Sequence, residues 1–214
     1  MNNLGKFCTH FGMQVNTSKT KVIVFKRGGT LKRCEKWYFD GKRLDSVNIF
    51  RYLGLAFSFN GNWKHHAKTS ARKMTQASVP VLRFLKQMRS ANALKVGLRL
   101  FDSMIAPIGL YGSEIFAFSD LSALECASRK FYRKLLAIPS GAPSAGCELL
   151  LGRHKFCVAA KLRAVKFWLK IISLDDTSIV KQATGGHRKG RQLLGGNGQV
   201  NARLIRPLFC LDAT

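Results

Sequence analysis

The spacing of apolar residues changes near residue 61, from a period typical of strands to one typical of helices. Upstream of this point, short apolar runs alternate with turn residues. The dipeptide Asp40-Gly41 supplies the positive backbone angles of a tight turn, so it predicts a hairpin between strands at 37–39 and 42–47. The first part of the chain is therefore expected to form short antiparallel strands and hairpins.

Two further apolar segments predict strands in the same region. Residues 21–25 form a short run rich in β-branched side chains, which indicates a buried strand. Residues 50–59 are aromatic and apolar around Gly54, which predicts one strand that is bulged or sharply bent at the glycine.

A helical period dominates from Trp63 onward and places apolar side chains on one face of a first long helix. Pro80 lies inside that helix and is expected to kink or split it, because proline has no N–H for the helical ladder. The positions predicted to be buried are Ala67, Ala71, Met74, Ser78, Val81, Leu85 and Met88.

Three further helices are predicted downstream. The second helix presents on one face Leu94, Leu98, Phe101, Ile105 and Ile108. The third begins at Ser122, which has capping-box spacing to Glu125, and continues with Ala127, Phe131 and Leu135. The fourth spans about 155–172, and its inward positions are predicted to be Val158, Leu162, Val165, Leu169 and Ile172. Its cations are expected in solvent, namely Lys155, Arg163, Lys166 and Lys170.

The net charge of the chain indicates what kind of partner it binds. The chain has 214 residues with 36 Lys and Arg against 11 Asp and Glu, a formal charge of +25 and a pI near 10.5. The commonest partner of so basic a chain is nucleic acid, and a membrane surface is the rarer alternative. No apolar run approaches the roughly 18 to 20 residues that cross a bilayer, and no secretory signal is seen. An intracellular location, nuclear or cytoplasmic, is therefore expected.

Cysteine, histidine and acidic residues show no metal-site pattern. The six cysteines are scattered without a Cys-x-x-Cys pair, which predicts free thiols. Cys147, His154 and Cys157 lack finger spacing and a fourth ligand. Asp175-Asp176 has no upstream carboxylate on a strand to complete a site. No metal and no cofactor is therefore assigned to this chain.

One ordered set of segments resembles a known family. The segments are Phe11-Gly12, Met13-Gln14-Val15-Asn16, Lys19-Thr20, Val22 to Phe25 and Phe50-Arg51-Tyr52-Leu53-Gly54. Their order and spacing resemble motifs D and E, at the end of the palm, in the reverse transcriptases of non-LTR, LINE-type retrotransposons. The resemblance runs from Leu4 to about Trp168 and includes the later segment Leu110-Tyr111-Gly112-Ser113-Glu114.

The resemblance implies an α+β fold, with a partial palm of short antiparallel strands and hairpins followed by a mainly α-helical thumb and a C-terminal helical segment. It implies a palm remnant over 1–60, a thumb over 61–111 and a helical connection segment over 112–174. Residues 175–214 are basic and rich in glycine between 185 and 199, and they are expected to form a flexible tail.

The resemblance also implies RNA-directed DNA synthesis, and it shows what this chain lacks. The family's two-metal chemistry holds Mg²⁺ with an aspartate on an early palm strand and a Tyr-x-Asp-Asp pair. Neither motif occurs here, so the chain is expected to be inactive alone, with the N-terminal part of the polymerase as a candidate partner. Lys19 matches the motif D lysine, which in a complete enzyme would neutralise or protonate departing pyrophosphate.

The resemblance also implies a hairpin that contacts the primer terminus. Its matching residues are Phe50, Tyr52, Leu53 and Gly54. We expect the two aromatic rings to pack inward while the backbone around Leu53-Gly54 touches the primer.

Four cations of the first long helix are expected to bind nucleic acid through its backbone, without sequence preference. They are Lys64, Lys68, Arg72 and Lys73. By resemblance to a thumb, they would line the phosphates of a primer-template duplex or RNA.

Three other functions fit the same residues. A stand-alone basic nucleic-acid-binding protein would be a stable monomer whose binding weakens steeply with salt. A non-functional remnant would aggregate, because palm strands without their partners expose sheet edges. Binding to a membrane surface would rest on the basic amphipathic helices alone.

Overall fold

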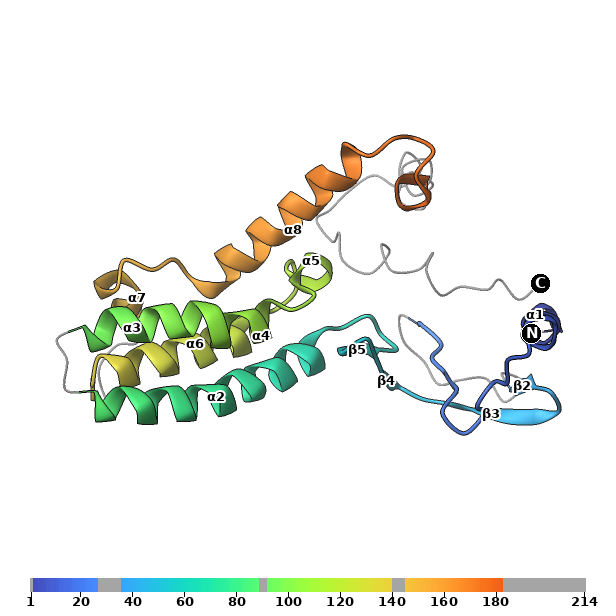
Figure 1. Cartoon of the computed structure of the whole chain (residues 1–214), viewed down its shortest axis with the longest axis horizontal. Helices are drawn as coiled ribbons and strands as arrows, with labels where there is room; N and C mark the ends of the chain where they lie inside the picture. Colours follow the sequence, from blue (N-terminus) through green and yellow to red (C-terminus); the bar gives the residue numbers. More distant parts are fainter. Residues whose placement is uncertain (1, 27–35, 89–91, 140–144, 183–214) are drawn as a thin grey trace. The chain divides into compact units, whose positions relative to one another are not determined.

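The computed structural model describes residues 2–26, 36–88, 92–139 and 145–182 (Figure 1). The chain divides into two units, Met1–Trp63 and Lys64–Thr214. The first carries the short strands and the second is helical, so the expected α+β class is confirmed. The glycine-rich stretch at 185–199 lies outside the described residues. Within the described part of the expected tail, residues 179–182 are helical.

The first unit begins with helix α1 (Asn2–His10) and a loop, followed by a three-stranded sheet. Its strands are β1 (Lys21–Val22), β2 (Trp37–Phe39) and β3 (Lys42–Ser46), in the order β1-β3-β2. The predicted hairpin is confirmed, because β2 and β3 are antiparallel around Asp40 and Gly41, whose φ angles are 49° and 69°. Strand β1 is shorter than the expected 21–25, and it pairs with β3 in parallel.

The aromatic segment at 50–59 is two strands, and the prediction of one bent strand is wrong. Strands β4 (Ile49–Tyr52) and β5 (Leu55–Ser58) pair in antiparallel register, with Tyr52 opposite Leu55. Between them, Leu53 and Gly54 have φ angles of 46° and 83°. Two successive left-handed residues reverse the chain in a tight turn, whereas a bulge would have continued it.

The buried residues of the first unit lie on β3, on β5 and at Trp63. Leu44 of β3 is 2% exposed, and Leu55, Ala56 and Phe57 of β5 are all buried. The ring of Phe57 lies 5.2 Å from that of Trp63.

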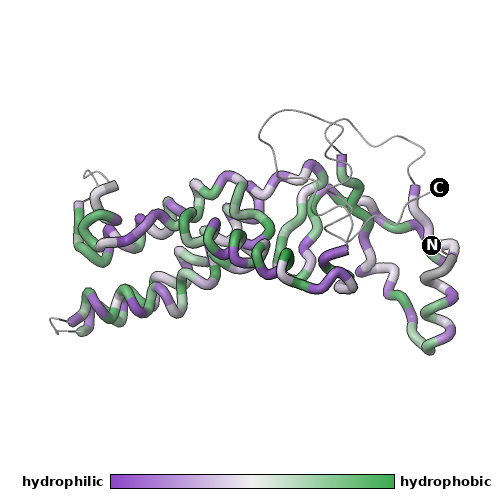
Figure 2. The backbone as a smooth tube through the Cα atoms, turned by 90° about the horizontal axis from the view of Figure 1, so that it is seen from above, coloured by the Kyte–Doolittle hydropathy of each residue, from purple (hydrophilic) through white to green (hydrophobic). Residues whose placement is uncertain are grey.

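The second unit begins with the long helix α2 (Lys64–Gln87), which runs through Pro80 without a break. The helix is therefore not split, although Pro80 removes one backbone donor at a cost of roughly 3 kcal/mol. Buried side chains on both sides of the proline, Ser78 and Val81 among them, hold the helix in its packing. Every predicted inward position is buried except Met88, which is half-buried. Figure 2 shows apolar and polar positions alternating along the helices.

The second predicted helix is divided into three pieces. They are α3 (Ala93–Leu100), the π-helix η1 (Phe101–Ile105) and α4 (Ala106–Leu110), followed by the short α5 (Ser113–Phe116). The N–H of Ala106 donates to the carbonyl of Phe101, five residues earlier, which widens the helix by one residue. Phe101 and Ile105 are buried as predicted, but Leu94 is 43% exposed.

Helix α6 (Ser122–Leu135) packs along α2 and carries its predicted apolar face inward. Ser122 is the first helical residue and not the N-cap, so the predicted capping box is wrong. Instead, the N–H of Ser122 donates to Oδ1 of Asp120 at 3.0 Å. This bond is the main cause that lowers the pKa of Asp120. The helix ends at Leu135, and Ala137, two residues later, has a φ of 52°.

The last helices are α7 (Ala145–Leu150) and α8 (Phe156–Ile172), and α8 packs on α5 and α6. The predicted orientation of α8 is wrong. Its buried residues are Phe156, Ala160, Ala164 and Ile171, whereas all five positions predicted to face inward are exposed. The small alanine side chains let α8 approach its neighbouring helices closely, so the face that carries them is buried. The helix has two apolar faces, and the periodicity of the sequence did not show which of them would be buried. Among the described helices, none has the length and apolarity needed to cross a bilayer.

Candidate nucleic-acid interface

An open groove of about 380 Å³ runs between α2 and α6. Its α2 wall is formed by Ala71, Arg72, Thr75 and Gln76. Its α6 wall is formed by Ala123, Cys126, Ala127 and Lys130. The lining contains one cation from each helix and no carboxylate, so every charged side chain that lines the groove is positive.

A row of cations on α2 leads up to this groove and enters its lining at Arg72. Lys64, Lys68 and Arg72 are four residues apart, so they follow one face of the helix, and all three are exposed. Lys64 is the first residue of α2 and lies near Asp120, which precedes α6. Its positive charge is the smallest of the causes that lower the pKa of Asp120. We call these three residues the α2 cation row.

Lys73 is the one expected contact that the structure does not place in this row. A step of one residue turns a helix by about 100°, so Lys73 points away from the face that carries Arg72. It is exposed but does not line the groove.

Two cations of α6 were missed by the sequence analysis. Lys130 lines the groove opposite Arg72, and Lys134 follows it by one helical turn and is also exposed. Neither lysine is on the buried face of α6, which includes Leu124 and Phe131. Their spacing of four residues on the exposed side of the predicted helix was therefore a signal present in the sequence. Only the pairing of α2 with α6 shows that Lys130 lies across the groove from Arg72, while Lys134 lies one turn further toward the end of α2 that carries Leu85.

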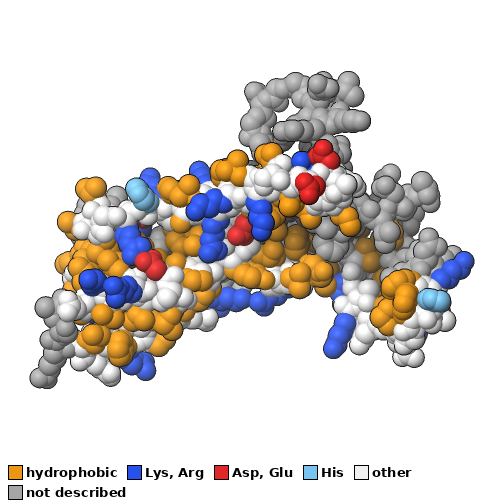
Figure 3. Space-filling view, turned by 45° about the horizontal axis from the view of Figure 1, so that its top comes forward, with side chains coloured by type: hydrophobic (Ala, Val, Ile, Leu, Met, Phe, Trp, Pro, Cys, Tyr) orange, Lys and Arg blue, Asp and Glu red, His pale blue; other side chains and the backbone are white. Residues whose placement is uncertain are grey.

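The carboxylates near α6 lie on another side of the helix. Arg129 donates to Oε1 of Glu148 at 3.1 Å and to Oε2 of Glu125 at 3.4 Å. A hydrogen bond to Glu125, and then burial, raises the pKa of the Cys157 thiol. Glu125 and Lys130 are five residues apart and therefore about 140° apart around the helix. The ion pairs of Glu125 and Glu148 with Arg129 therefore lie on a different side of α6 from the groove. Figure 3 shows more Lys and Arg side chains than acidic ones on the face of the molecule that it draws.

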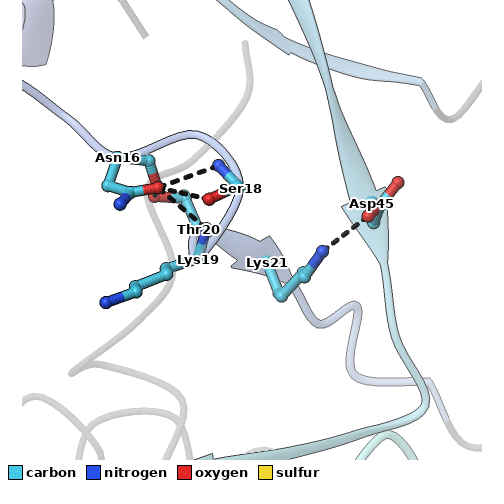
Figure 4. Close-up of polar contacts among 6 residues, drawn as sticks. All are labelled: Asn16, Ser18, Lys19, Thr20, Lys21 and Asp45. Atoms are coloured by element: carbon cyan, nitrogen blue, oxygen red, sulfur yellow. Dashed lines mark hydrogen bonds and ion pairs between the residues drawn. The ribbon is translucent and has the colours of Figure 1, made fainter.

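The loop that carries Lys19 is organised by Asn16 (Figure 4). Oδ1 of Asn16 accepts from the N–H and hydroxyl of Ser18 and from the N–H of Lys19, at 3.1, 2.6 and 3.2 Å. Its backbone carbonyl accepts from the N–H and hydroxyl of Thr20, at 3.0 and 2.8 Å. This short turn fixes the backbone before β1.

Lys19 and Lys21 leave this turn in different directions. Nζ of Lys21 lies on Oδ2 of Asp45, its partner across the β1–β3 pair, at 2.5 Å. That contact lowers the pKa of the Asp45 carboxyl. In Figure 4, the exposed Lys19 side chain points away from Lys21 and Asp45. The Lys19 ammonium is therefore not held by the Asp45 carboxylate that Lys21 contacts.

The hairpin expected to touch the primer has an exposed tip. Leu53 is 71% exposed at a positive φ, an uncommon conformation for a branched side chain. Phe50 is half-buried and lies opposite Phe57, but Tyr52 is 43% exposed, so the expectation that both rings pack inward is wrong for Tyr52. The tip therefore presents Tyr52, Leu53 and a glycine backbone together.

Side chains that commonly bind metals occur across the described residues. Across the described ranges, no group of three or more His, Cys, Asp or Glu side chains is placed to hold a metal ion.

Comparison with known proteins points to transposable elements. A 115 kDa protein of a type-1 retrotransposable element from Drosophila melanogaster is 26% identical over 161 residues, which are 73% of this chain and 16% of that protein. A transposon-derived protein of Caenorhabditis elegans is 29% identical over 119 residues, 52% of this chain and 39% of that protein. No protein-family model and no solved structure matches the chain. The chain is similar to parts of transposon-derived proteins, which supports a retrotransposon-related origin.

Proposed function

We propose that this chain is part of an RNA-directed DNA polymerase of a non-LTR retrotransposon, and that it binds a primer-template duplex. The groove between α2 and α6 carries the proposal, because Arg72 and Lys130 face it from opposite walls with no carboxylate in the lining. A pair of cations facing each other across a groove, with further cations along α2, suits the sugar-phosphate backbone of a duplex, which needs charge but no base contacts. The similarity to retrotransposon proteins adds independent support.

In this proposal the chain binds and positions nucleic acid and does not perform the metal chemistry. The 214 residues contain no Tyr-x-Asp-Asp sequence, and no step here passes through Mg²⁺. The β4–β5 hairpin would touch the primer backbone at its exposed tip, where Gly54 permits close approach. Lys19 would meet phosphate oxygens in the assembled polymerase.

The test is binding of the full chain to a fluorescently labelled RNA–DNA hybrid, measured by anisotropy at about 50 and 200 mM salt. Wild-type affinity is expected to fall by about two to three orders of magnitude across this range if roughly five phosphates are neutralised. Lys68→Gln/Arg72→Gln and Lys130→Gln/Lys134→Gln are each expected to weaken binding about tenfold and to lower the salt slope by up to about two.

A matched control removes the same charge elsewhere. Lys95 and Arg99 are exposed on α3, two positions on either side of the buried Gly97. Lys95→Gln/Arg99→Gln is expected to leave the affinity within about threefold of wild type. Equal losses in this control and in the groove variants would show that net charge, and not the groove, binds the duplex.

A further inference from the structure

Helix α8 carries a second apolar face that nothing in the described chain covers. The residues on this face are Val158, Leu162, Val165, Leu169 and Ile172, which we call the α8 stripe. They are 38%, 55%, 45%, 61% and 53% exposed. The opposite face, with Ala160 and Ala164 completely buried, already packs against the rest of its unit. The α8 stripe is therefore not needed for the packing of α8 itself.

The spacing of the α8 stripe is that of a coiled-coil seam. Its residues follow one another at intervals of four, three, four and three, which is the heptad alternation of d and a positions. Leu162 and Leu169 occupy a positions, while Val158, Val165 and Ile172 occupy d positions. The five residues lie within about 80° of the helix circumference, a width that suits one facing helix.

Two of the four positions that flank the seam within α8 are cationic, and the other two are Ala159 and Trp168. Lys161 is a g position and Lys166 is an e position, and both side chains are exposed. Helix α8 contains no Asp or Glu. In a coiled coil these flanking positions choose the partner by charge, so the facing helix should carry carboxylates at its own e and g positions.

We infer that the α8 stripe docks an amphipathic helix of a partner protein, with apolar a and d positions and acidic flanks. A second copy of α8 would place Lys161 and Lys166 against lysines, which disfavours a homodimer through this face. The chain's own residues 183–214 contain one carboxylate, Asp212, too few for such flanks. A membrane surface would favour a wider apolar face than this seam. This inference is independent of duplex binding in the groove.

The probe is a labelled synthetic helix of about three heptads with Leu and Ile at a and d and Glu at every e and g position. Glu at both flanks makes the result independent of helix direction. Anisotropy with the full chain should show binding that is about tenfold tighter than for the same peptide with Lys at e and g. A scrambled peptide of the same composition should bind as weakly as the Lys peptide.

Variants of the chain locate the contact. Leu162→Gln/Leu169→Gln should weaken the Glu peptide about tenfold, whereas Leu149→Gln/Leu150→Gln, at exposed residues of α7, should not. Lys161→Glu/Lys166→Glu should reverse the preference toward the Lys peptide, and it leaves the apolar stripe intact. Lys68→Gln/Arg72→Gln should bind the Glu peptide like wild type, which separates this contact from the groove.

Several outcomes would overturn the inference. Equal binding of the Glu, Lys and scrambled peptides would do so, as would unchanged binding by a folded Leu162→Gln/Leu169→Gln chain. A concentration-dependent dimer that this variant abolishes would assign the stripe to a second copy. Binding to anionic vesicles through Leu162 and Leu169, without binding to the Glu peptide, would assign it to a membrane.

Discussion

Arg153 and Asp102 form a bidentate ion pair across 51 residues of chain. Nη1 and Nη2 of Arg153 each donate to one carboxylate oxygen of Asp102 at 2.7 Å. The pair joins the π-helix η1 to the segment that leads into α8, and the hydrogen bond raises the pKa of Arg153. It ties together parts of the second unit that are far apart in sequence.

We predict a measurable coupling between these two residues. The side chains are 29% and 50% exposed, so solvent screens the charges, but the two-fold geometry is favourable. A double-mutant cycle with Asp102→Asn and Arg153→Gln should give about 0.5–1 kcal/mol in urea unfolding. Strictly additive single effects would show that the pair adds no stability.

Ala137→Gly should stabilise the second unit. Ala137 has a φ of 52° at the end of α6, and the N–H of Ile138 donates to the carbonyl of Arg133 at 3.0 Å. This is the Schellman ending that favours glycine, so the substitution should raise the free energy of unfolding by about 0.5–1 kcal/mol. Ala159→Gly, at an exposed position inside α8, should lower it by a similar amount. Two changes of the same sign would contradict this explanation.

Gly109→Ala should destabilise the second unit. A Cβ at the buried Gly109 would press on Sδ of Met74 and lie 2.9 Å from Cζ of Phe156. Overpacking of this kind costs roughly 1–3 kcal/mol. Gly146→Ala provides the comparison, since a Cβ there meets nothing within 4 Å and should favour α7 by about 0.5–1 kcal/mol. Thermal unfolding of the two variants should shift in opposite directions.

The contact between Lys21 and Asp45 should make the first unit sensitive to acid. The pKa of Asp45 lies below its ordinary value of 3.8, first through the Lys21 hydrogen bond and then through the Lys21 charge. The Asp45 carboxyl therefore binds its proton less tightly in the folded state than in the unfolded chain. The stabilisation that the contact with Lys21 gives is present above about pH 4 and is lost below it. In Lys21→Gln, the unfolding midpoint should therefore fall less steeply as the pH is lowered below about 4. Lys42→Gln, on β3, should change this pH dependence less. Parallel acid limbs in wild type and Lys21→Gln would argue against the contact.

Leu53→Asn should stabilise the first unit and change its binding surface. Asparagine tolerates the left-handed conformation that Leu53 adopts at a φ of 46°, so a gain of about 1 kcal/mol is expected. If the tip touches nucleic acid, the same variant should also alter affinity for the RNA–DNA hybrid. A more stable variant with unchanged affinity would remove the hairpin tip from the interface while leaving the groove unaffected.

Local signals in the sequence were sufficient for elements set by short-range preferences. The Asp40-Gly41 hairpin forms as predicted, because these two residues adopt the required positive φ angles. The buried face of α2 was also predicted, since that helix has one apolar face. The tight turn at Leu53-Gly54 was missed from the pattern alone, because leucine is a poor signal for a left-handed residue.

The candidate site was predicted in part. Three of the four expected α2 cations follow one face, as their spacing of four requires, whereas Lys73 follows Arg72 directly and turns away. Lys130 and Lys134 were not predicted, because nothing along the chain indicated that α6 would lie beside α2. Whether any of these cations contacts a phosphate is still a prediction.

The sequence was enough to predict the change of period near residue 61, the hairpin at Asp40-Gly41, the inward face of α2 and the excess of positive charge. Each depends on local backbone preference, on a single apolar face or on composition. Packing between helices was needed to show which of the two apolar faces of α8 is buried and which cations face each other across the groove. The physical reason is that close packing selects among faces of similar hydrophobicity by shape, and alanines at 160 and 164 fit the neighbouring helices more closely than the larger side chains of the α8 stripe.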